Sequence, residues 1–342
     1  MLKTPLNKAV VACAGSGKTT LIVSEALKVK DSNVLITTYT NENIDQIKQS
    51  IIEQNGFIPQ NIYVVPWFTF LLREGVRPYQ SCMSTSPRVE SILFQDTLNK
   101  FHKKNDYFTK NNYIYSQKLS EFAFECNIKS GGLVIKRLEK IYTHIFIDEL
   151  QDFAGYDLNF FEELFKSSVN VITVGDPRQS TFATNNSSKN SKYRGSKIYE
   201  WLQEQEQKGN ISIEEKTDCH RCNQTICDYA DLLYPLLPKT TSKNTTTTNH
   251  DGIFLVQEHE LDEYIKQHTP VILRYNKRSK TFDYTALNIG LSKGRTYDRV
   301  LVFPTKNMIE FIKTKDHTKA GDVSKLYVAI TRARHSVAFV VS

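Results

Sequence analysis

Short apolar runs alternate with longer amphipathic segments along most of the chain. Most of the short runs are continuously apolar, which is typical of parallel strands buried on both faces. They predict strands at Lys8–Ala12, Asn33–Tyr39, Asn61–Val65, His144–Asp148, Val169–Gly175, Ile253–Gln257, Val271–Tyr275, Arg299–Pro304 and Val337–Val341. The segments between them predict helices at Thr19–Val29, Asn41–Glu53, Asp157–Phe165 and Ile226–Leu233. This alternation indicates a doubly wound α/β fold with parallel sheets.

Two regions break the alternation. From about Phe68 to Leu138 the chain is predicted to be mainly helical and basic. Aromatic side chains are scattered through this region at Phe101, Tyr107, Phe108, Tyr113 and Tyr115. The tract Lys239–Asn249 is rich in Thr, Asn and Ser and predicts a flexible loop or linker.

Composition and charge narrow the class of protein. The chain has 342 residues, enough for two domains, and its 40% hydrophobic and 24% charged residues are typical of a soluble globular protein. No run of roughly 18 apolar residues is present, and the start has no long apolar core, so we expect neither a membrane span nor a secretion signal. Six cysteines without a disulfide-scaffold pattern favour a reducing cytoplasm. The net charge of +7 permits a nucleic-acid partner without proving one.

A glycine-rich turn joins the first predicted strand to the first predicted helix. It reads Ala12-Cys13-Ala14-Gly15-Ser16-Gly17-Lys18-Thr19, with Ala12 where the strict phosphate-loop pattern has glycine. Small residues let backbone N–H groups surround phosphates, and the helix N-terminus adds its positive dipole end. We expect Lys18 to contact the β- and γ-phosphates of ATP, and Thr19 to ligate Mg²⁺. The other predicted ATP contacts of this turn are Ala14, Gly15, Ser16, Gly17 and Thr20.

A second candidate for phosphate chemistry is the buried strand that ends in Asp148-Glu149. Carboxylates at the carboxyl end of a parallel strand border the crevice in which such sheets bind ligands. We expect Asp148 to hold Mg²⁺ through water and Glu149 to polarise the attacking water. A strand that ends in Asp-Glu is common by itself, so the assignment depends on the phosphate loop.

A series of segments, in order along the chain, resembles the motifs of UvrD/Rep-like superfamily 1 helicases. The phosphate loop is similar to A-x-A-G-S-G-K-T, and Asp148–Asp152 is similar to D-E-x-Q-D. The other matching segments are Thr38–Asn41, Trp67–Phe70, Gly175–Phe182, His220–Cys222, Ser292–Gly294 and Tyr327–Ala333. The resemblance implies two RecA-like P-loop NTPase domains with parallel sheets. We expect them at residues 1–210, with the helical insertion at about 68–138, and 211–342.

The resemblance also implies roles for single residues. Gln151 and Gln179 would sense the γ-phosphate, and Gln179 is counted with the catalytic residues Asp148 and Glu149. Arg221 and Arg332 would act as arginine fingers, because a cation supplied on domain closure stabilises the charge that develops during phosphoryl transfer. The remaining ATP contacts implied by the resemblance are His220 and Gly294.

The DNA contacts implied by the resemblance lie in both predicted domains, at Thr38, Tyr39, Asn41, Trp67, Phe182 and Lys293. The aromatic rings of Tyr39, Trp67 and Phe182 would stack on bases, a contact that tolerates any base sequence. Aromatic side chains usually fill protein cores, so a core role remains the alternative for Trp67 and Phe182.

Several positions depart from the family pattern. Only eleven residues precede Ala12, so we expect no adenine-reading glutamine upstream of the loop and a loose selectivity for adenine. His220 stands where relatives have a base-stacking tyrosine, and Gly290 where they have histidine. Arg295-Thr296 replaces the usual glutamate. About a dozen residues separate Asn276 from the next motif, so the large second-domain insertion of relatives is missing.

Two local patterns suggest other chemistry. Cys219-x-x-Cys222, with His220 and Cys227 nearby, is compatible with zinc, but a structural zinc site usually has a second paired cluster and the sequence has none. The basic run Lys100–Lys110 is predicted either to contact nucleic-acid phosphates or to form a solvated helix face.

The sequence therefore predicts a cytoplasmic enzyme that uses ATP and Mg²⁺. The first hypothesis is a translocase or helicase that acts on single-stranded or tailed DNA, with the 3′–5′ polarity expected from the family. The alternative is a nucleic-acid-gated ATPase that signals to a partner protein, such as a nuclease, without unwinding. The missing insertion favours the alternative, whereas the complete set of hydrolysis residues favours the first.

Overall fold

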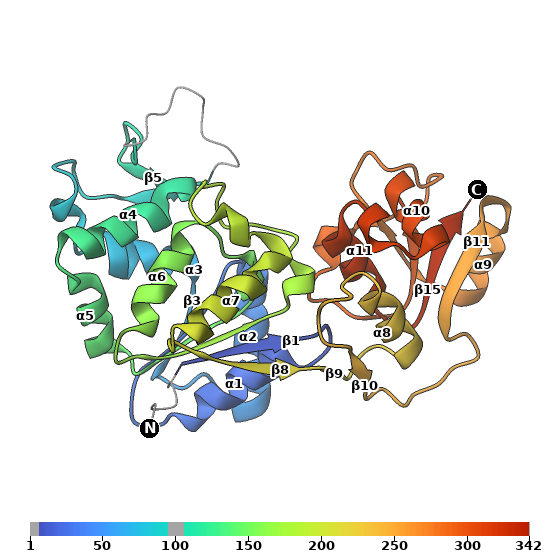
Figure 1. The fold of residues 1–342 in the computed structure, drawn as a ribbon, viewed down its shortest axis with the longest axis horizontal. Helices are drawn as coiled ribbons and strands as arrows, with labels where there is room; N and C mark the ends of the chain where they lie inside the picture. Colours follow the sequence, from blue (N-terminus) through green and yellow to red (C-terminus); the bar gives the residue numbers. More distant parts are fainter. Residues whose placement is uncertain (1–6, 95–105, 342) are drawn as a thin grey trace. The chain divides into compact units, whose positions relative to one another are not determined.

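The computed structural model describes residues 7–94 and 106–341, which form two compact units (Figure 1). Unit 1 comprises the described residues within 7–11, 18–177 and 182–214. Unit 2 comprises 12–17, 178–181 and 215–341. Each unit is built on its own α/β sheet. Among the described residues, no helix has the length and apolar character needed to cross a membrane.

Unit 1 contains a sheet with the strand order β3-β2-β6-β7-β1-β8. The pairs β3–β2, β2–β6, β6–β7 and β7–β1 are parallel. Its strands are β1 (Lys8–Ala12), β2 (Val34–Thr38), β3 (Ile62–Pro66), β6 (His144–Ile147), β7 (Asn170–Gly175) and β8 (Ser212–Lys216). The central strand β2 is buried along its whole length, as its continuous apolar sequence predicts.

Helices cover both faces of the unit 1 sheet (Figure 1). They are α1 (Lys18–Lys28), α2 (Asn41–Asn55), α6 (Tyr156–Phe165) and α7 (Ile198–Gln207). α1 and α2 contact β2, while α6 and α7 share a core with the alternate strand residues Val11, Leu35 and Ile147. Because successive strand residues point to opposite faces, this arrangement confirms the doubly wound prediction for unit 1.

The predicted helical insertion is largely helical, and it also contains a short parallel pair of strands. Its helices are α3 (Trp67–Phe70), a π-helical turn (Leu71–Val76), α4 (Ser116–Lys129) and α5 (Leu133–Ile141). The strands β4 (Ser91–Leu93) and β5 (Tyr113–Tyr115) pair in parallel. Tyr107 and Phe108 pack edge-on against Phe122 of α4, with ring centroids 4.9 and 5.1 Å apart. Phe101 and the basic residues from Lys100 to Lys104 lie outside the described residues.

Unit 2 contains a parallel sheet with the strand order β11-β15-β14-β12-β13. Its strands are β11 (Gly252–Gln257), β12 (Val271–Arg274), β13 (Leu287–Asn288), β14 (Tyr297–Phe303) and β15 (Ala333–Val341). Its helices are α8 (Gln224–Asp231), α9 (Leu261–His268), α10 (Lys306–Thr314) and α11 (Val323–Ile330). α8, α10 and α11 share a core on one face of the sheet, and α9 packs on the other with Leu301 and Val340. The second half is therefore also doubly wound.

A two-stranded parallel ladder precedes this sheet in unit 2. It pairs β9 (Asp218–Cys219) with β10 (Thr241–Ser242), so the tract predicted as a loop contains a short strand. The tract is also held by side chains, because the Asn244 amide donates to the Arg221 carbonyl over 2.8 Å. The segment Lys239–Asn249 is therefore more ordered than its composition suggests.

Candidate functional site

The carboxyl edge of the unit 1 sheet gathers polar residues. Because β1, β2, β6 and β7 are parallel, their carboxyl ends meet at one edge. Asp148 follows β6 and Asp176 follows β7, and their side chains are almost fully buried. The Asp148 N–H donates to the carbonyl of Thr37 on β2 over 2.9 Å. The predicted magnesium ligand Asp148 thus lies at the ligand-binding edge of the sheet.

A hydrogen-bonded chain connects the ends of β6 and β7. The Glu149 N–H donates to Asp148 Oδ1 over 2.9 Å, and the Gln151 amide donates to the Glu149 carboxylate. The N–H of Asp176 in turn donates to Gln151 Oε1 over 2.9 Å. Gln151 is therefore in contact with the residue predicted to polarise water, as a γ-phosphate sensor would need to be.

The backbone is specialised at two points of this chain. Glu149 has a φ of 56°, in the left-handed region that a residue with a Cβ adopts only at an energetic cost. A Cβ added to Gly175 would lie 2.6 Å from Gln151 Oε1 and would displace it. Both features fix where the polar atoms of Glu149 and Gln151 lie, and strained residues of this kind concentrate at functional sites.

Helix α1 begins at Lys18, directly after the phosphate loop. Its first turn contains Lys18, Thr19 and Thr20 and no acidic residue. The positive end of the helix dipole, with no acidic residue beside it, therefore favours an anion. The sequence-predicted Lys18 and Thr19 are both half-buried at this helix end.

The loop itself, residues 12–17, is described within unit 2. Gly15 and Gly17 have φ values of 74° and 78°, which favour glycine. The Gly15 carbonyl accepts the N–H of His220 over 2.9 Å, and a Cβ on Gly15 would lie 2.7 Å from Arg221 Cβ. The buried Ser16 Oγ has no hydrogen-bond partner among the described residues. An orphaned hydroxyl in a turn of glycines fits the binding of a phosphate oxygen.

Three of the predicted catalytic residues lie together in unit 2. Arg332 is 1% exposed and donates from Nη2 to Gln179 Oε1 over 2.9 Å. Its Nε also donates to the Val328 carbonyl over 3.1 Å. Arg221 donates from Nη1 to the carbonyl of Thr331, which immediately precedes Arg332, over 3.0 Å. The two predicted arginine fingers are therefore anchored on the same turn between α11 and β15.

The predicted DNA contacts of unit 1 differ in exposure. Phe182 is 45% exposed, whereas Trp67 is fully buried. Trp67 donates from Nε1 to Asp157 Oδ1 over 2.7 Å and packs on Phe161 with centroids 4.9 Å apart. Its position therefore corresponds to the core alternative, because a buried indole presents no face on which a base can stack. Tyr39 is half-buried and packs edge-on against a neighbouring phenylalanine.

The other predicted residues lie near element ends. Thr38 is buried at the end of β2, and Asn41 is exposed at the start of α2. In unit 2, Lys293 is half-buried and Gly294 exposed, directly after the turn Ile289–Ser292. His220 is exposed beside the loop carbonyl that its N–H contacts.

Two buried polar residues outside the predicted set also organise these regions. Asp157 of α6 accepts hydrogen bonds from Trp67, Ser120, Thr184 and the Asn185 amide. Burial raises the pKa of this carboxyl, which the surrounding donors partly offset. In unit 2, the Tyr327 hydroxyl accepts the Ala14 N–H at 3.5 Å. The signal for Asp157 was its helical spacing, because it shares a face with Phe160, Phe161 and Leu164.

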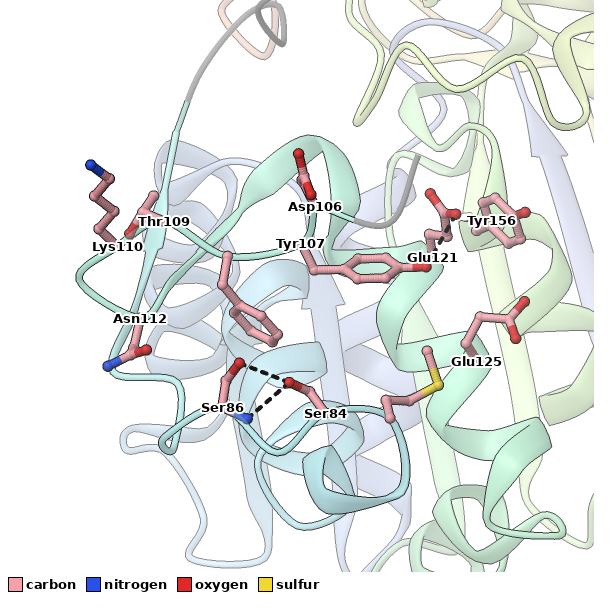
Figure 2. A pocket seen from close by; sticks show the side chains of 12 residues that line it. Ser84, Ser86, Asp106, Tyr107, Thr109, Lys110, Asn112, Glu121, Glu125 and Tyr156 are labelled. Carbon is pink, nitrogen blue, oxygen red and sulfur yellow. Dashed lines mark hydrogen bonds between the residues drawn. The ribbon is translucent and has the colours of Figure 1, made fainter. Parts of the chain in front are cut away.

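A separate cavity of about 670 Å³ lies in the helical insertion (Figure 2). None of the sequence-predicted site residues lines it. Figure 2 shows the Tyr107 ring directed at Glu121, whose carboxylate accepts the phenol over 3.4 Å. Glu121 also pairs with Lys118 over 2.8 Å. Burial and the charge of Glu121 raise the pKa of Tyr107, which keeps the phenol a hydrogen-bond donor to Glu121.

The sequence is similar to known helicases. Residues 95–188 match the family model described as the UvrD/REP helicase N-terminal domain. The chain is 26% identical to the Gabija protein GajB of Bacillus cereus (strain VD045), over 68% of this chain and 47% of that protein. It therefore spans about half the length of this curated relative.

Solved structures share the fold. The crystal structure of arterivirus nonstructural protein 10 (helicase) matches 99% of this chain and 61% of its own, with a TM-score of 0.51 and 16% identity. The complex of that helicase with DNA gives a TM-score of 0.51 and 15% identity, over 99% of this chain and 62% of its own. The chain thus shares with these helicases a fold of parallel α/β sheets of the RecA-like kind. In sequence, the chain is similar to UvrD/Rep helicases over residues 95–188 and to the Gabija protein GajB, the resemblance that its motifs predicted.

Proposed function

We propose that the chain hydrolyses ATP with Mg²⁺ and couples hydrolysis to movement along single-stranded or tailed DNA, as a 3′–5′ translocase or helicase. The observation that carries this proposal is the hydrogen-bonded chain from Asp148 through Glu149 and Gln151 to Asp176 at the carboxyl edge of the unit 1 sheet. In this chain, Asp148 provides a carboxylate for the metal and Glu149 a carboxylate that can orient water. Gln151 provides an amide that can sense the γ-phosphate.

In this proposal, Mg²⁺ bound to the triphosphate would neutralise charge on the phosphate oxygens. Thr19 and Asp148 would hold it, and the N–H groups of the glycine turn would bind phosphate oxygens. Glu149 would accept a hydrogen bond from the attacking water and orient it. The orphaned Ser16 Oγ and the acid-free first turn of α1 support the fit of a triphosphate to these residues.

Unit 2 would supply the cations. The guanidinium of Arg332 is preorganised by its bonds to Gln179 Oε1 and the Val328 carbonyl, and Arg221 by its bond to Thr331. Preorganised charge stabilises a phosphoryl-transfer transition state better than a flexible side chain does. The exposed Phe182 and half-buried Tyr39 would provide the stacking contacts to bases.

A second candidate function follows from the connection between β12 and β13. Only twelve residues separate Arg274 from Leu287, so no domain is inserted there. A motor without that domain could hydrolyse ATP in response to DNA and signal to a partner protein, such as a nuclease, without separating strands. The short connection favours this alternative, whereas the hydrolysis residues serve both.

Paired assays distinguish the two functions. ATPase activity is measured with and without single-stranded DNA, and strand displacement on a duplex with a 3′ single-stranded tail, with a 5′-tailed duplex as control. We expect stimulated ATPase activity and displacement of the 3′-tailed duplex alone. Stimulated ATPase activity without displacement would select the switch. ATP hydrolysis that ignores both DNA and RNA would contradict both functions.

A further inference from the structure

Three buried cysteines of unit 2 form a cluster beside the phosphate loop. Cys219 ends β9, Cys222 precedes α8, and Cys227 lies within α8; each is at most 3% exposed. The Cys227 thiol donates to the Cys222 carbonyl over 3.9 Å, and all three side chains lie in one hydrophobic core. All three are free thiols. Neighbouring thiols on two separate backbone elements can be joined by a disulfide where a movement brings their sulfurs together.

The environment of the Cys219 sulfur favours its thiolate. Cys219 Sγ accepts the N–H of Cys222 over 3.3 Å, and hydrogen bonding from Cys222 and Cys227 favours its charged form. These donors, Cys222 first, lower the pKa of Cys219. The pKa of Cys227 is raised in return, chiefly by its bond to Cys219. Because the thiolate is the reactive form of cysteine, we expect Cys219 to be the nucleophile of the cluster.

The same sulfur touches the phosphate loop. A Cβ built on Gly15 would lie 3.0 Å from Cys219 Sγ, so the Gly15 backbone and the sulfur are in close packing. The N–H of His220, the next residue, donates to the Gly15 carbonyl over 2.9 Å. Cys222 Sγ in turn lies 3.6 Å from the carbonyl of Thr331, the acceptor of Arg221. A change at the sulfurs would therefore reach both the loop and an arginine finger.

We propose that Cys219, Cys222 and Cys227 form an oxidation site in which a peroxide joins Cys219 to Cys222 or Cys227 and thereby inhibits nucleotide turnover. The inference rests on the proposed ATPase function for its consequence, but not for the bond itself. Metal binding is the competing use of such thiols. Among the described residues, no group of three or more His, Cys, Asp or Glu has an arrangement that could hold a metal ion.

The chemistry has two balanced steps. The Cys219 thiolate attacks hydrogen peroxide, which gives Cys219 sulfenic acid and hydroxide; sulfur is oxidised and the O–O bond is broken. The thiol of Cys222 or Cys227 then displaces the hydroxyl as water, and the S–S bond forms. A dithiol reductant returns both thiols through a mixed disulfide. Because the side chains are buried, we expect the first step to be slow.

The disulfide would disturb the loop because it draws the Cys219 sulfur toward its partner. The S–S bond is about 2.05 Å long, shorter than any contact between separate sulfurs. The Gly15 backbone, packed on that sulfur, would shift with it. Misplacement of a phosphate-binding group by about 1 Å costs as much as a hundredfold in rate, so we expect ATP hydrolysis to fall by at least tenfold.

The test uses the full chain, reduced and then exposed to hydrogen peroxide. Remaining thiols are blocked with N-ethylmaleimide, and the protein is digested with trypsin under non-reducing conditions. Cleavage after Arg221 places Cys219 and Cys222 in different peptides, so mass spectrometry identifies the bond directly. We expect a peptide that contains Cys219 linked to the peptide that contains Cys222 and Cys227, a matching loss of ATPase activity, and recovery of both with dithiothreitol.

Matched variants locate the effect. Cys219→Ser should form no cross-link, and its ratio of peroxide-treated to untreated activity should be near one. Cys82→Ser and Cys126→Ser, in unit 1, should retain the parent's peroxide sensitivity. The cross-link and its reversal are measured on the parent protein itself. The test is therefore decided even where a variant folds poorly.

Four outcomes would overturn the proposal: no cross-link, a cross-link through Cys13, a cross-link that leaves ATPase activity unchanged, or stoichiometric zinc in the purified protein. Failure of the proposed function is distinguishable from these. It would appear as absent ATPase activity in the reduced protein, whatever the thiols do.

Discussion

The two units have the same architecture and different chemistry at the carboxyl edges of their sheets. In unit 1, β6 is followed by Asp148 and β7 by Asp176, both buried carboxylates. In unit 2, β12 ends in Arg274, whose Nε donates to Asn288 Oδ1 over 3.1 Å, and β14 ends before Pro304. At the ends of these strands, unit 1 thus presents buried carboxylates, whereas unit 2 presents an arginine and a proline.

The cations of unit 2 lie instead at a helix–strand junction. Arg332 occupies the turn between α11 and β15, and Arg221 is bound to the residue before it. A doubly wound sheet therefore does not decide which chemistry it carries; a few residues at its strand ends and turns do. In both units, changes to core residues should affect stability and changes to the candidate site should affect activity, and the substitutions below examine that contrast.

The largest effect is expected in unit 1, from Trp67→Ala. Removing a fully buried indole costs about 3–5 kcal/mol in the free energy of unfolding, and it also deprives Asp157 of a donor. Chemical denaturation would measure the loss. Trp67→Phe retains most of the ring and loses the hydrogen bond, so it should cost less. If Trp67→Ala left stability unchanged and weakened DNA binding instead, the core assignment would be wrong.

The next largest effect is expected from Lys18→Ala, which should lower the rate of ATP hydrolysis. The side chain stands at the N-terminus of α1, where it would stabilise charge on the transferred phosphoryl group. Loss of one such donor costs about 10²–10³ in kcat. Lys28, at the other end of the same helix and paired with Glu25, is the matched control, and Lys28→Ala should hydrolyse ATP normally. Hydrolysis by Lys18→Ala at nearly the parent rate would contradict the assignment of the loop.

Within unit 2, substitutions of the two arginines should differ in their effect on the free energy of unfolding. Arg332 is buried and donates to Gln179 Oε1 and Val328, so Arg332→Ala should lower both the rate and the free energy of unfolding, the latter by about 1.5–3 kcal/mol. Arg221 is half-buried, and Arg221→Ala should lower the rate with little loss of stability. Thermal denaturation beside steady-state kinetics checks both. Equal losses of stability in Arg332→Ala and Arg221→Ala would contradict the structural role assigned to Arg332 alone.

The fold could be predicted from the sequence where burial is continuous. The strand β2 was predicted within one residue of each end, because its apolar run is unbroken. β8 was not predicted, because its sequence Ser-Ile-Glu-Glu-Lys lacks an apolar run at the edge of the sheet. β15 begins at Ala333, four residues before its predicted start, because Arg334, His335 and Ser336 interrupt the pattern.

The residues of the candidate site could be named from motifs, but their contacts could not. The motif order indicates Gln179 and Arg332, yet their hydrogen bond joins residues 153 positions apart and depends on tertiary packing. The contact of Cys219 with Gly15 is likewise non-local. Trp67 shows the converse, because a motif position indicated a base contact where the surrounding phenylalanines create a core.

The smallest effect, and the sharpest contrast with Trp67, is expected from Phe182→Ala. Phe182 is 45% exposed, so its loss should leave the free energy of unfolding nearly unchanged. The following loop stays anchored without it, because the Thr184 N–H donates to the Asp152 carbonyl over 2.9 Å and the Asn185 amide to the Ala154 carbonyl over 2.8 Å.

A lost base stack at Phe182 should weaken affinity for single-stranded DNA by about 1–3 kcal/mol. Fluorescence anisotropy with labelled oligonucleotides at several salt concentrations would measure it. The salt dependence should match the parent's, because stacking releases no counterions. Unchanged affinity would leave Phe182 as an exposed aromatic side chain without a role in binding, and would shift the search for a base contact to Tyr39.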